Sequence, residues 1–207
     1  MNYKYITIEG NIGAGKTTLA NRLAKHYSAR IILEEFAENP FLPKFYEKPQ
    51  QYAFPLELFF MAERYKQLKD MLQAQDLFSN FIISDYLFIK SLLFAKINLK
   101  EEEYSLYQKL FEIINPQLPQ PDLLIFLNAP ITKLQQNIKT RNRSYEQQIA
   151  DEYLVSVHDM YMQYIRQHPI RTLMIDTTKT DFLNNPTDFD SLLNALEKEY
   201  EPGIHYL

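Results

Sequence analysis

The stretch Gly10-Asn11-Ile12-Gly13-Ala14-Gly15-Lys16-Thr17 holds three of the four glycines of the chain. It matches G-x-x-x-x-G-K-[ST], the pattern of a phosphate-binding loop. Glycine permits positive φ and close approach of a ligand to the backbone, so this concentration predicts a special backbone path. Residues 3–9 read as a strand and residues 17–27 as an amphipathic helix. The loop therefore joins a strand to a helix, which is the context that the motif requires.

This loop predicts a binding site for a nucleoside triphosphate. Its backbone N–H groups and the helix N-terminus would bind the β-phosphate. Lys16 would reach the β and γ oxygens, and Thr17 would hold Mg²⁺. The residues expected to bind ATP are Gly10, Asn11, Ile12, Gly13, Ala14, Gly15, Lys16, Thr17 and Thr18.

The composition limits the class of protein. The 207 residues suffice for a hydrophobic core without a linker, so we expect a single domain over residues 1–207. The absence of cysteine excludes disulfides, thiolate zinc sites and cysteine nucleophiles. A net charge of −4 with scattered Lys and Arg gives no broad surface for nucleic acid. No apolar run approaches the roughly 20 residues of a membrane span, and the first strand follows without a signal sequence. We therefore expect a cytoplasmic protein.

Short apolar runs separated by long helical stretches predict the fold. The runs lie at residues 31–33, 81–83, 123–127 and 172–175. Helices are expected at residues 52–75, 87–97, 101–115, 132–141, 147–167 and 188–200. This alternation is typical of an α/β fold with a parallel sheet covered by helices on both faces. The tail after Pro202 is expected to fray, as chain ends commonly do, and the alternative is that it docks through Ile204, Tyr206 and Leu207.

Acidic residues follow two of the predicted strands. Ligands of open parallel sheets bind outside the carboxyl ends of the strands. Glu34 and Glu35 follow the second strand, and Asp85 follows the third. These carboxylates would meet the triphosphate at one edge, where phosphoryl transfer needs an acceptor base and a metal-bound acid. The alternative is that they only cap the following helices.

Two arginines, Arg141 and Arg143, come just before a predicted helix. They predict a lid at about residues 141–147 that stabilises the transferred phosphoryl group and excludes water. A solvated basic turn is the alternative. The chain lacks the Asn-Lys-x-Asp segment and the Asp-x-x-Gly after a strand that mark GTPase switches, so transfer to a bound acceptor is favoured over hydrolysis.

Taken together, these residues resemble the deoxynucleoside kinase family, in particular the bacterial deoxyadenosine/deoxyguanosine kinases. The resemblance covers nearly the whole chain, and its motifs are Gly10 to Thr18, Glu34 to Phe41, Phe45-Tyr46, Arg64, Asp85 and Arg141-x-Arg143-x-x-Glu146. It implies a three-layer P-loop fold with an arginine-bearing lid, and phosphorylation of the 5′-hydroxyl of a deoxynucleoside by ATP. It also implies a homodimer.

The resemblance assigns roles to individual residues. Glu34 matches the base that accepts the 5′-hydroxyl proton, with Glu35 as the reserve. Tyr46 and Glu146 match the pair that contacts the sugar 3′-hydroxyl, and Arg64 matches an arginine that helps to read the base. Asp85 would serve the metal or act as a second base.

Three positions depart from the family pattern. Glu57 stands in place of a base-reading glutamine, Tyr86 in place of an arginine beside the substrate, and Ser91 in place of an aspartate. Ionised Glu57 only accepts hydrogen bonds, which favours guanine; alternatively it pairs with Arg64 on the same helix face. The charge lost at Tyr86 is expected to come from Lys90 or Arg64.

We therefore predict an ATP-dependent deoxynucleoside kinase that requires Mg²⁺ and acts on a purine, either deoxyguanosine or deoxyadenosine. One alternative is a nucleoside monophosphate kinase of the thymidylate kinase type, which would need further basic groups for the acceptor phosphate. Another is a non-catalytic nucleotide-binding regulator. The presence of Lys16, Glu34 and the two lid arginines favours catalysis, because a sensor needs no acceptor base.

Overall fold

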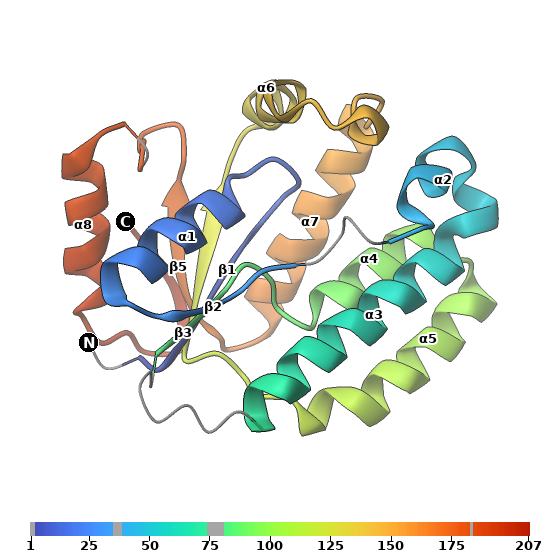
Figure 1. Cartoon of the computed structure of the whole chain (residues 1–207), viewed down its shortest axis with the longest axis horizontal. Coiled ribbons are helices and arrows are strands. Elements are labelled where there is room, and N and C mark those ends of the chain that lie inside the picture. Colours follow the sequence, from blue (N-terminus) through green and yellow to red (C-terminus); the bar gives the residue numbers. More distant parts are fainter. Residues whose placement is uncertain (1–2, 35–38, 74–80, 183) are drawn as a thin grey trace.

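A parallel sheet forms the centre of the molecule. The computed structural model describes residues 3–34, 39–73, 81–182 and 184–207, and six parallel strands in this part of the chain pair in the order β2-β3-β1-β4-β5-β6 (Figure 1). Their bounds are β1 Tyr5–Gly10, β2 Arg30–Ile32, β3 Ile82–Ser84, β4 Leu123–Asn128, β5 Arg171–Asp176 and β6 Gly203–Tyr206. Five of them were predicted: β1 as the strand before the phosphate-binding loop, and β2 to β5 from the four apolar runs.

The helices connect and cover these strands. They are α1 Lys16–Tyr27, α2 Leu42–Glu47, α3 Pro49–Gln73, α4 Lys90–Asn98, α5 Glu101–Ile114, α6 Ile131–Arg141, α7 Asp151–Gln167 and α8 Pro186–Leu196, with 3₁₀ helices η1 Asn115–Gln117 and η2 Ser144–Glu146. Each predicted helix occurs, with shifted ends, whereas the short α2, η1 and η2 were not predicted. No described helix combines the length and apolarity that crossing a bilayer demands.

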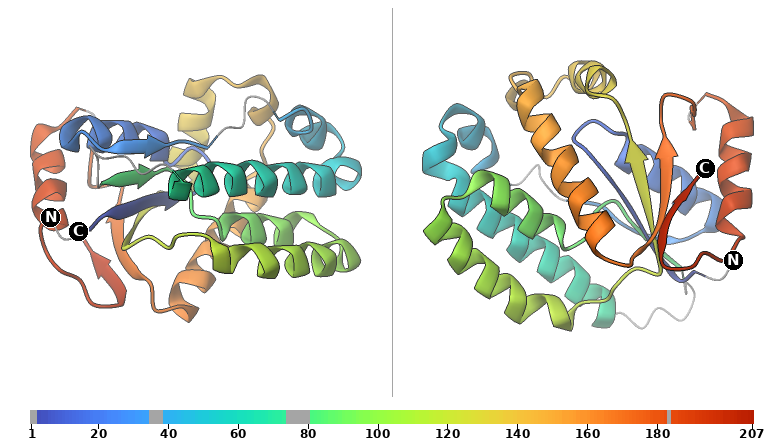
Figure 2. Two further views of the ribbon diagram at one scale, coloured as in Figure 1. Left: turned by 60° about the horizontal axis from the view of Figure 1, so that its bottom comes forward. Right: turned by 180° about the vertical axis from the view of Figure 1, so that it is seen from behind.

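Alternating side chains give the sheet two apolar faces. Leu123, Ile125 and Leu127 of β4 pack on the side of α1 and α8, whereas Leu124 and Phe126 pack on the side of α7. Figure 2 shows α7 lying across the sheet on the side opposite α1. Because successive residues of a strand point to opposite faces, a continuous apolar run buries both. The result is the predicted three-layer arrangement.

A group of helices extends the molecule beyond the sheet. Helices α3, α4 and α5 lie side by side, away from α8 (Figure 1). Buried residues from all three helices, including Leu68, Ala95, Tyr107 and Phe111, form one cluster. This group places the start of α4 and the middle of α3 next to the phosphate-binding loop.

The chain end is ordered, so the prediction of a frayed tail was wrong. Residues Gly203–Tyr206 form β6 and pair with β5 in parallel. The N–H of Gly203 donates to the carbonyl of Ile170, and the N–H of Leu207 donates to that of Met174. Without β6, strand β5 would expose unpaired backbone groups along its edge, and the tail satisfies them.

Candidate active site

The loop between β1 and α1 has the backbone that its glycines predict. Gly10, Gly13 and Gly15 have φ of 149°, 81° and 93°. A Cβ at Gly10 would lie 2.7 Å from the carbonyl oxygen of Leu127, and one at Gly13 would lie 2.8 Å from that of Leu134. Other residues are therefore excluded at Gly10 and Gly13 by space as well as by φ.

Polar contacts hold this loop. Asn11 Nδ2 donates to the carbonyl of Leu154, and Asn137 Nδ2 donates to that of Gly13, both at 2.7 Å. Lys16 Nζ donates to two loop carbonyls, at 3.0 Å and 2.9 Å. Burial, together with the charge of Lys90, lowers the pKa of Lys16 to about 8. Because burial and Lys90 disfavour the charged form of Lys16, the negative charge of an anion bound beside Lys16 would stabilise that form.

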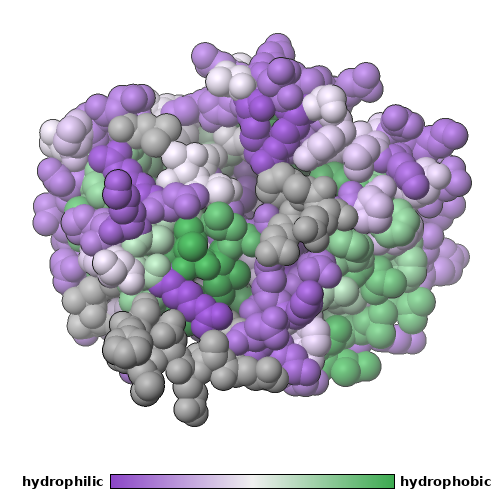
Figure 3. Space-filling view, viewed as in Figure 1, coloured by the Kyte–Doolittle hydropathy of each residue, from purple (hydrophilic) through white to green (hydrophobic). Residues whose placement is uncertain are grey.

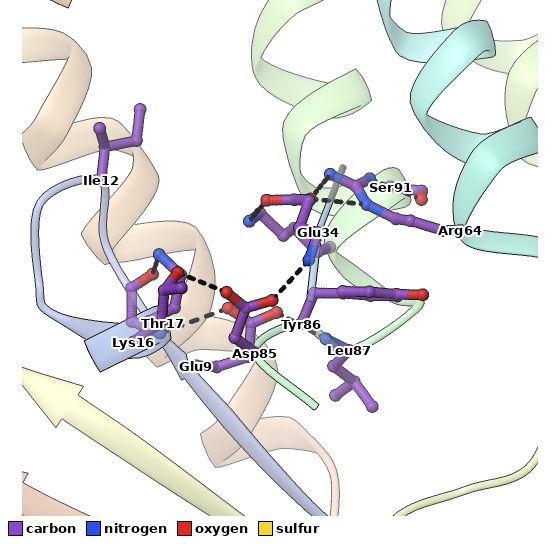
Figure 4. A network of polar contacts seen from close by, with 12 residues as sticks. Glu9, Ile12, Lys16, Thr17, Glu34, Arg64, Asp85, Tyr86, Leu87 and Ser91 are labelled. Atoms are coloured by element: carbon purple, nitrogen blue, oxygen red, sulfur yellow. Dashed lines mark hydrogen bonds and ion pairs between the residues drawn. The ribbon is translucent and has the colours of Figure 1, made fainter. Parts of the chain in front are cut away.

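Glu9 fixes the end of β1 through two hydrogen bonds. This buried carboxylate accepts from the N–H of Leu87 at 2.8 Å (Figure 4). It also accepts from the hydroxyl of Tyr161 at 2.8 Å. Burial raises the pKa of Glu9. Glu9 thus ties the start of the loop to the segment after β3, and sequence reasoning did not single it out.

Asp85 joins the loop to the end of β2. Its Oδ2 accepts from Thr17 Oγ1 at 2.5 Å, and its Oδ1 accepts from the N–H of Glu34 at 2.7 Å (Figure 4). Hydroxyl and carboxylate oxygens are hard donors, and Mg²⁺ is usually bound by one or two protein oxygens together with substrate phosphates. Thr17 and Asp85 therefore fit a magnesium site.

Glu34 lies between two buried cations. Its Oε1 accepts from Arg64 Nε at 2.9 Å and Nη2 at 2.5 Å, and its Oε2 accepts from Lys90 Nζ at 2.6 Å. Arg64 Nη1 donates to Ser91 Oγ at 2.7 Å. Burial disfavours the charged form of Glu34, but Lys90 and Arg64 outweigh it and hold the pKa of Glu34 well below its usual range. Both cations named as replacements for the missing arginine thus contact this carboxylate.

Glu57 differs from the sequence-based expectation in two ways. It does not pair with Arg64, which is engaged by Glu34 and Ser91; instead Glu57 Oε1 accepts from Asn98 Nδ2 at 2.6 Å. It is also not simply ionised, because burial raises the pKa of Glu57 to about 7. Sequence reasoning missed Asn98, although Lys90, Phe94 and Asn98 are spaced by four on α4 and share a face.

The residues of the predicted lid contact one another. Glu146, which is buried, accepts from both Arg141 and Arg143, the latter at 3.2 Å. The ring of Tyr145 stacks on that of Tyr46, with centroids 6.1 Å apart. The short helix α2 and the segment after α6 therefore contact each other through these two rings.

Two cavities flank the loop. The inner cavity is lined by twelve of the predicted site residues: Ile12, Gly13, Lys16, Thr17, Glu34, Tyr46, Glu57, Arg64, Asp85, Arg141, Arg143 and Glu146. The outer cavity is lined by the loop, by Thr18 and by residues after β5 such as Thr177. Both cavities are lined by Gly13, Lys16, Thr17, Arg141 and Arg143. The loop lysine and the two arginines therefore stand where the cavities join.

Tyr86, a predicted substrate-binding residue, is not brought to the inner cavity. Tyr86 is fully buried and its hydroxyl donates to Gln67 Oε1 at 2.7 Å. It packs in the cluster of Tyr5 and Ile32, and Figure 4 shows its ring directed away from Lys16 and Thr17. Glu35 lies outside the described residues.

Comparisons with known proteins identify relatives over nearly the whole chain. A family profile described as Deoxynucleoside kinase matches residues 6–200. Deoxyguanosine kinase of Bacillus subtilis (strain 168) is 34% identical over 193 residues, covering 91% of this chain and 93% of the relative. Deoxyadenosine/deoxycytidine kinase of the same organism is 30% identical over 201 residues, covering 92% and 90%. The structure of deoxyadenosine kinase from M. mycoides with bound dATP has a TM-score of 0.81 at 24% identity, over 93% of this chain and 99% of that one. This similarity confirms the α/β fold.

Proposed function

Because the chain belongs to the deoxynucleoside kinase family and is thus a phosphotransferase, we propose that it phosphorylates the 5′-hydroxyl of a purine deoxynucleoside with ATP. The observation that carries this proposal is the pair of cavities that share Lys16, Thr17, Arg141 and Arg143. ATP would occupy the outer cavity and the deoxynucleoside the inner one. The phosphoryl group would then cross between them at the shared residues.

The reacting groups are positioned by the contacts around Glu34. Phosphoryl transfer has a loose transition state, so catalysis depends mainly on position and on charge. The cations Arg64 and Lys90 hold Glu34 ionised and fixed, and it would orient the 5′-hydroxyl and accept its proton. Arg141 and Arg143 would leave Glu146 for the phosphates as the lid closes.

The metal site and the substrate contacts complete the proposal. Thr17 and Asp85 would hold Mg²⁺, which when bound neutralises charge on the phosphates. Tyr46 and Glu146, which both line the inner cavity, would contact the sugar 3′-hydroxyl. The apolar walls of that cavity, formed by residues such as Phe45, Phe60 and Phe94, would cover the base.

The test is a panel of the four deoxynucleosides and thymidine monophosphate with MgATP, scored for product and for ATP loss without acceptor. Formation of the 5′-monophosphate from a purine deoxynucleoside is expected. A diphosphate formed from thymidine monophosphate would instead identify a monophosphate kinase. Binding of ATP without any transfer would identify a regulator.

Lys90→Met is expected to lower turnover by about tenfold, because one of the two charges that hold Glu34 is lost. The pKa of Glu34 should rise, so the acid limb of the profile of kcat against pH should move to higher pH. Lys96→Met is the matched control, since Lys96 lies exposed on the same helix. An unchanged acid limb in Lys90→Met would contradict the role of Lys90.

We also propose that the protein is a homodimer, as the family resemblance implies. Hydrophobic residues gather over the region of α3 and α5 (Figure 3). Leu106 and Ile113 lie about two helical turns apart on α5, and they are 52% and 66% exposed. Sedimentation equilibrium should give twice the mass of the 24.6 kDa chain. A monomeric mass would overturn this proposal.

A further inference from the structure

Glu57 lines the inner cavity and carries an oxygen without a hydrogen-bond partner among the described residues. The residue is 2% exposed and lies on α3 in the cavity lining. Its Oε1 accepts from Asn98 Nδ2 at 2.6 Å, whereas its Oε2 is buried and has no hydrogen-bond partner among the described residues. A buried polar atom without a partner is costly, so a ligand that bonds to Oε2 gains that free energy on binding.

Among the described residues, no cation is bonded to this carboxyl. Arg64, on the same helix, donates to Glu34 and Ser91, and Lys90 of α4 donates to Glu34. The negative charge of Glu34 disfavours ionisation of Glu57, and the more distant charges of Arg64 and Lys90 favour it.

Tyrosines complete the surroundings of Glu57. Three tyrosines lie near Glu57: Tyr46 of α2, Tyr107 of α5 and Tyr153 of α7. Burial is the main cause that raises the pKa of each phenol, and the charge of Glu57 raises it further. These phenols therefore stay neutral and supply no charge near neutral pH. Burial is therefore the largest influence on Glu57 and raises its pKa to about 7. Both the carboxylate and the carboxylic acid are then populated near neutral pH.

The two states of a carboxyl group recognise different bases. An ionised carboxylate only accepts, which suits the N1–H and N2–H donors of guanine. A carboxylic acid donates through one oxygen and accepts through the other, which suits N1 and the N6 amino group of adenine. Since Asn98 donates to Oε1, the proton of the acid would reside on Oε2, the oxygen that has no protein partner.

We propose that Glu57 selects the base through its protonation state: the carboxylate takes guanine, and the carboxylic acid, with its proton placed by Asn98, takes adenine. This deepens the proposed function and rests on it. A glutamine at this position always offers a donor and an acceptor, whereas Glu57 offers both only when it is protonated.

The test measures kcat/KM for deoxyadenosine and deoxyguanosine between about pH 6 and about pH 8.5, on either side of the midpoint of Glu57. The deoxyadenosine-to-deoxyguanosine ratio should fall by up to about 300-fold over this range, because each base binds one protonation state and the ratio of acid to carboxylate falls about tenfold per pH unit. Titration of Lys16 acts on both substrates equally and cancels in the ratio.

Variants tie this dependence to Glu57. Glu57→Gln should make the ratio independent of pH and favour deoxyadenosine, whereas Glu63→Gln, on the same helix and outside the cavity lining, should behave as the wild type. Asn98→Ala removes a hydrogen bond that lowers the pKa of Glu57, so the titration midpoint in the kcat/KM profile of each purine should move to higher pH.

The melting temperature gives a readout without substrate. A carboxyl whose pKa is raised by folding contributes stability that is lost as pH rises through its folded pKa. The wild type should therefore lose stability relative to Glu57→Gln as pH rises from about 4.5 to about 7, and the difference should stay constant at higher pH.

A wild-type ratio that stays constant with pH while both purines react would overturn the role of Glu57 and leave the proposed function standing. The same pH dependence in Glu57→Gln would overturn it as well, since another group would then carry the titration. Failure of both purines to react at any pH would overturn the proposed function itself. If Glu57→Gln does not fold, the wild-type ratio and the Asn98→Ala midpoint still decide.

Discussion

Lys16→Ala is expected to lower turnover by about a hundredfold or more, the usual scale for a charge that stabilises a transition state. Lys16 stands where the two cavities join, and its Nζ contacts only loop carbonyls in the described structure. It belongs to the loop rather than to the apolar clusters, so its removal should leave the fold intact. The measurements are kcat at saturating ATP and the melting temperature.

The control for this substitution is Lys25→Ala, since Lys25 is exposed near the end of the same helix. It should change neither turnover nor stability. Retention by Lys16→Ala of more than about a tenth of wild-type turnover would contradict the assignment of the loop. Loss of the folded state would show that the loop lysine is structural.

The parts of the site that sequence reasoning predicted are those that a local pattern encodes. The spacing of Gly10, Gly13 and Gly15 specifies the backbone of the loop, because no other residue fits at the first two positions. Glu34 and Asp85 could be placed because the carboxyl ends of parallel strands meet at one edge. Their shared hydrogen bond from the N–H of Glu34 confirms that they lie together.

Other features depend on contacts between distant parts of the chain. The partner of Glu57 is Asn98, which lies 41 residues away and carries no motif. The pKa of Glu57 follows from burial by α3 and its neighbouring helices, and no local pattern reports that burial. Strand β6 was missed because its stability comes from pairing with β5 rather than from its own sequence.

Tyr86 stands at the sequence position where the family pattern has an arginine, but its side chain points away from the site. Asp85 points into the inner cavity, where it contacts Thr17. The side chain of Tyr86 is directed away from this cavity and packs in the apolar cluster that includes Met61 and Leu68 of α3. Lys90, the first residue of α4, supplies a positive charge to Glu34 instead.

Glu34→Gln is expected to lower turnover by at least about a hundredfold, the typical contribution of a general base. The amide keeps the shape of the side chain but cannot take the 5′-hydroxyl proton. It also leaves Arg64 and Lys90 without the charge that they share. Affinity for the deoxynucleoside should change less, because the cavity walls are kept. The measurements are single-turnover rates and the Kd of the deoxynucleoside.

Glu35→Gln is the control, because Glu35 is the adjacent acid and the only other candidate for the base at the end of β2. Its effect on turnover should be milder. If Glu35→Gln were the more damaging variant, the assignment of the base would be wrong by one residue. If instead Glu34→Gln weakened binding and transfer equally, Glu34 would act by organising Arg64 and Lys90 around the substrate. The acid limb of the kcat profile in Lys90→Met separates these cases, since it moves only when the ionisation of Glu34 itself limits transfer.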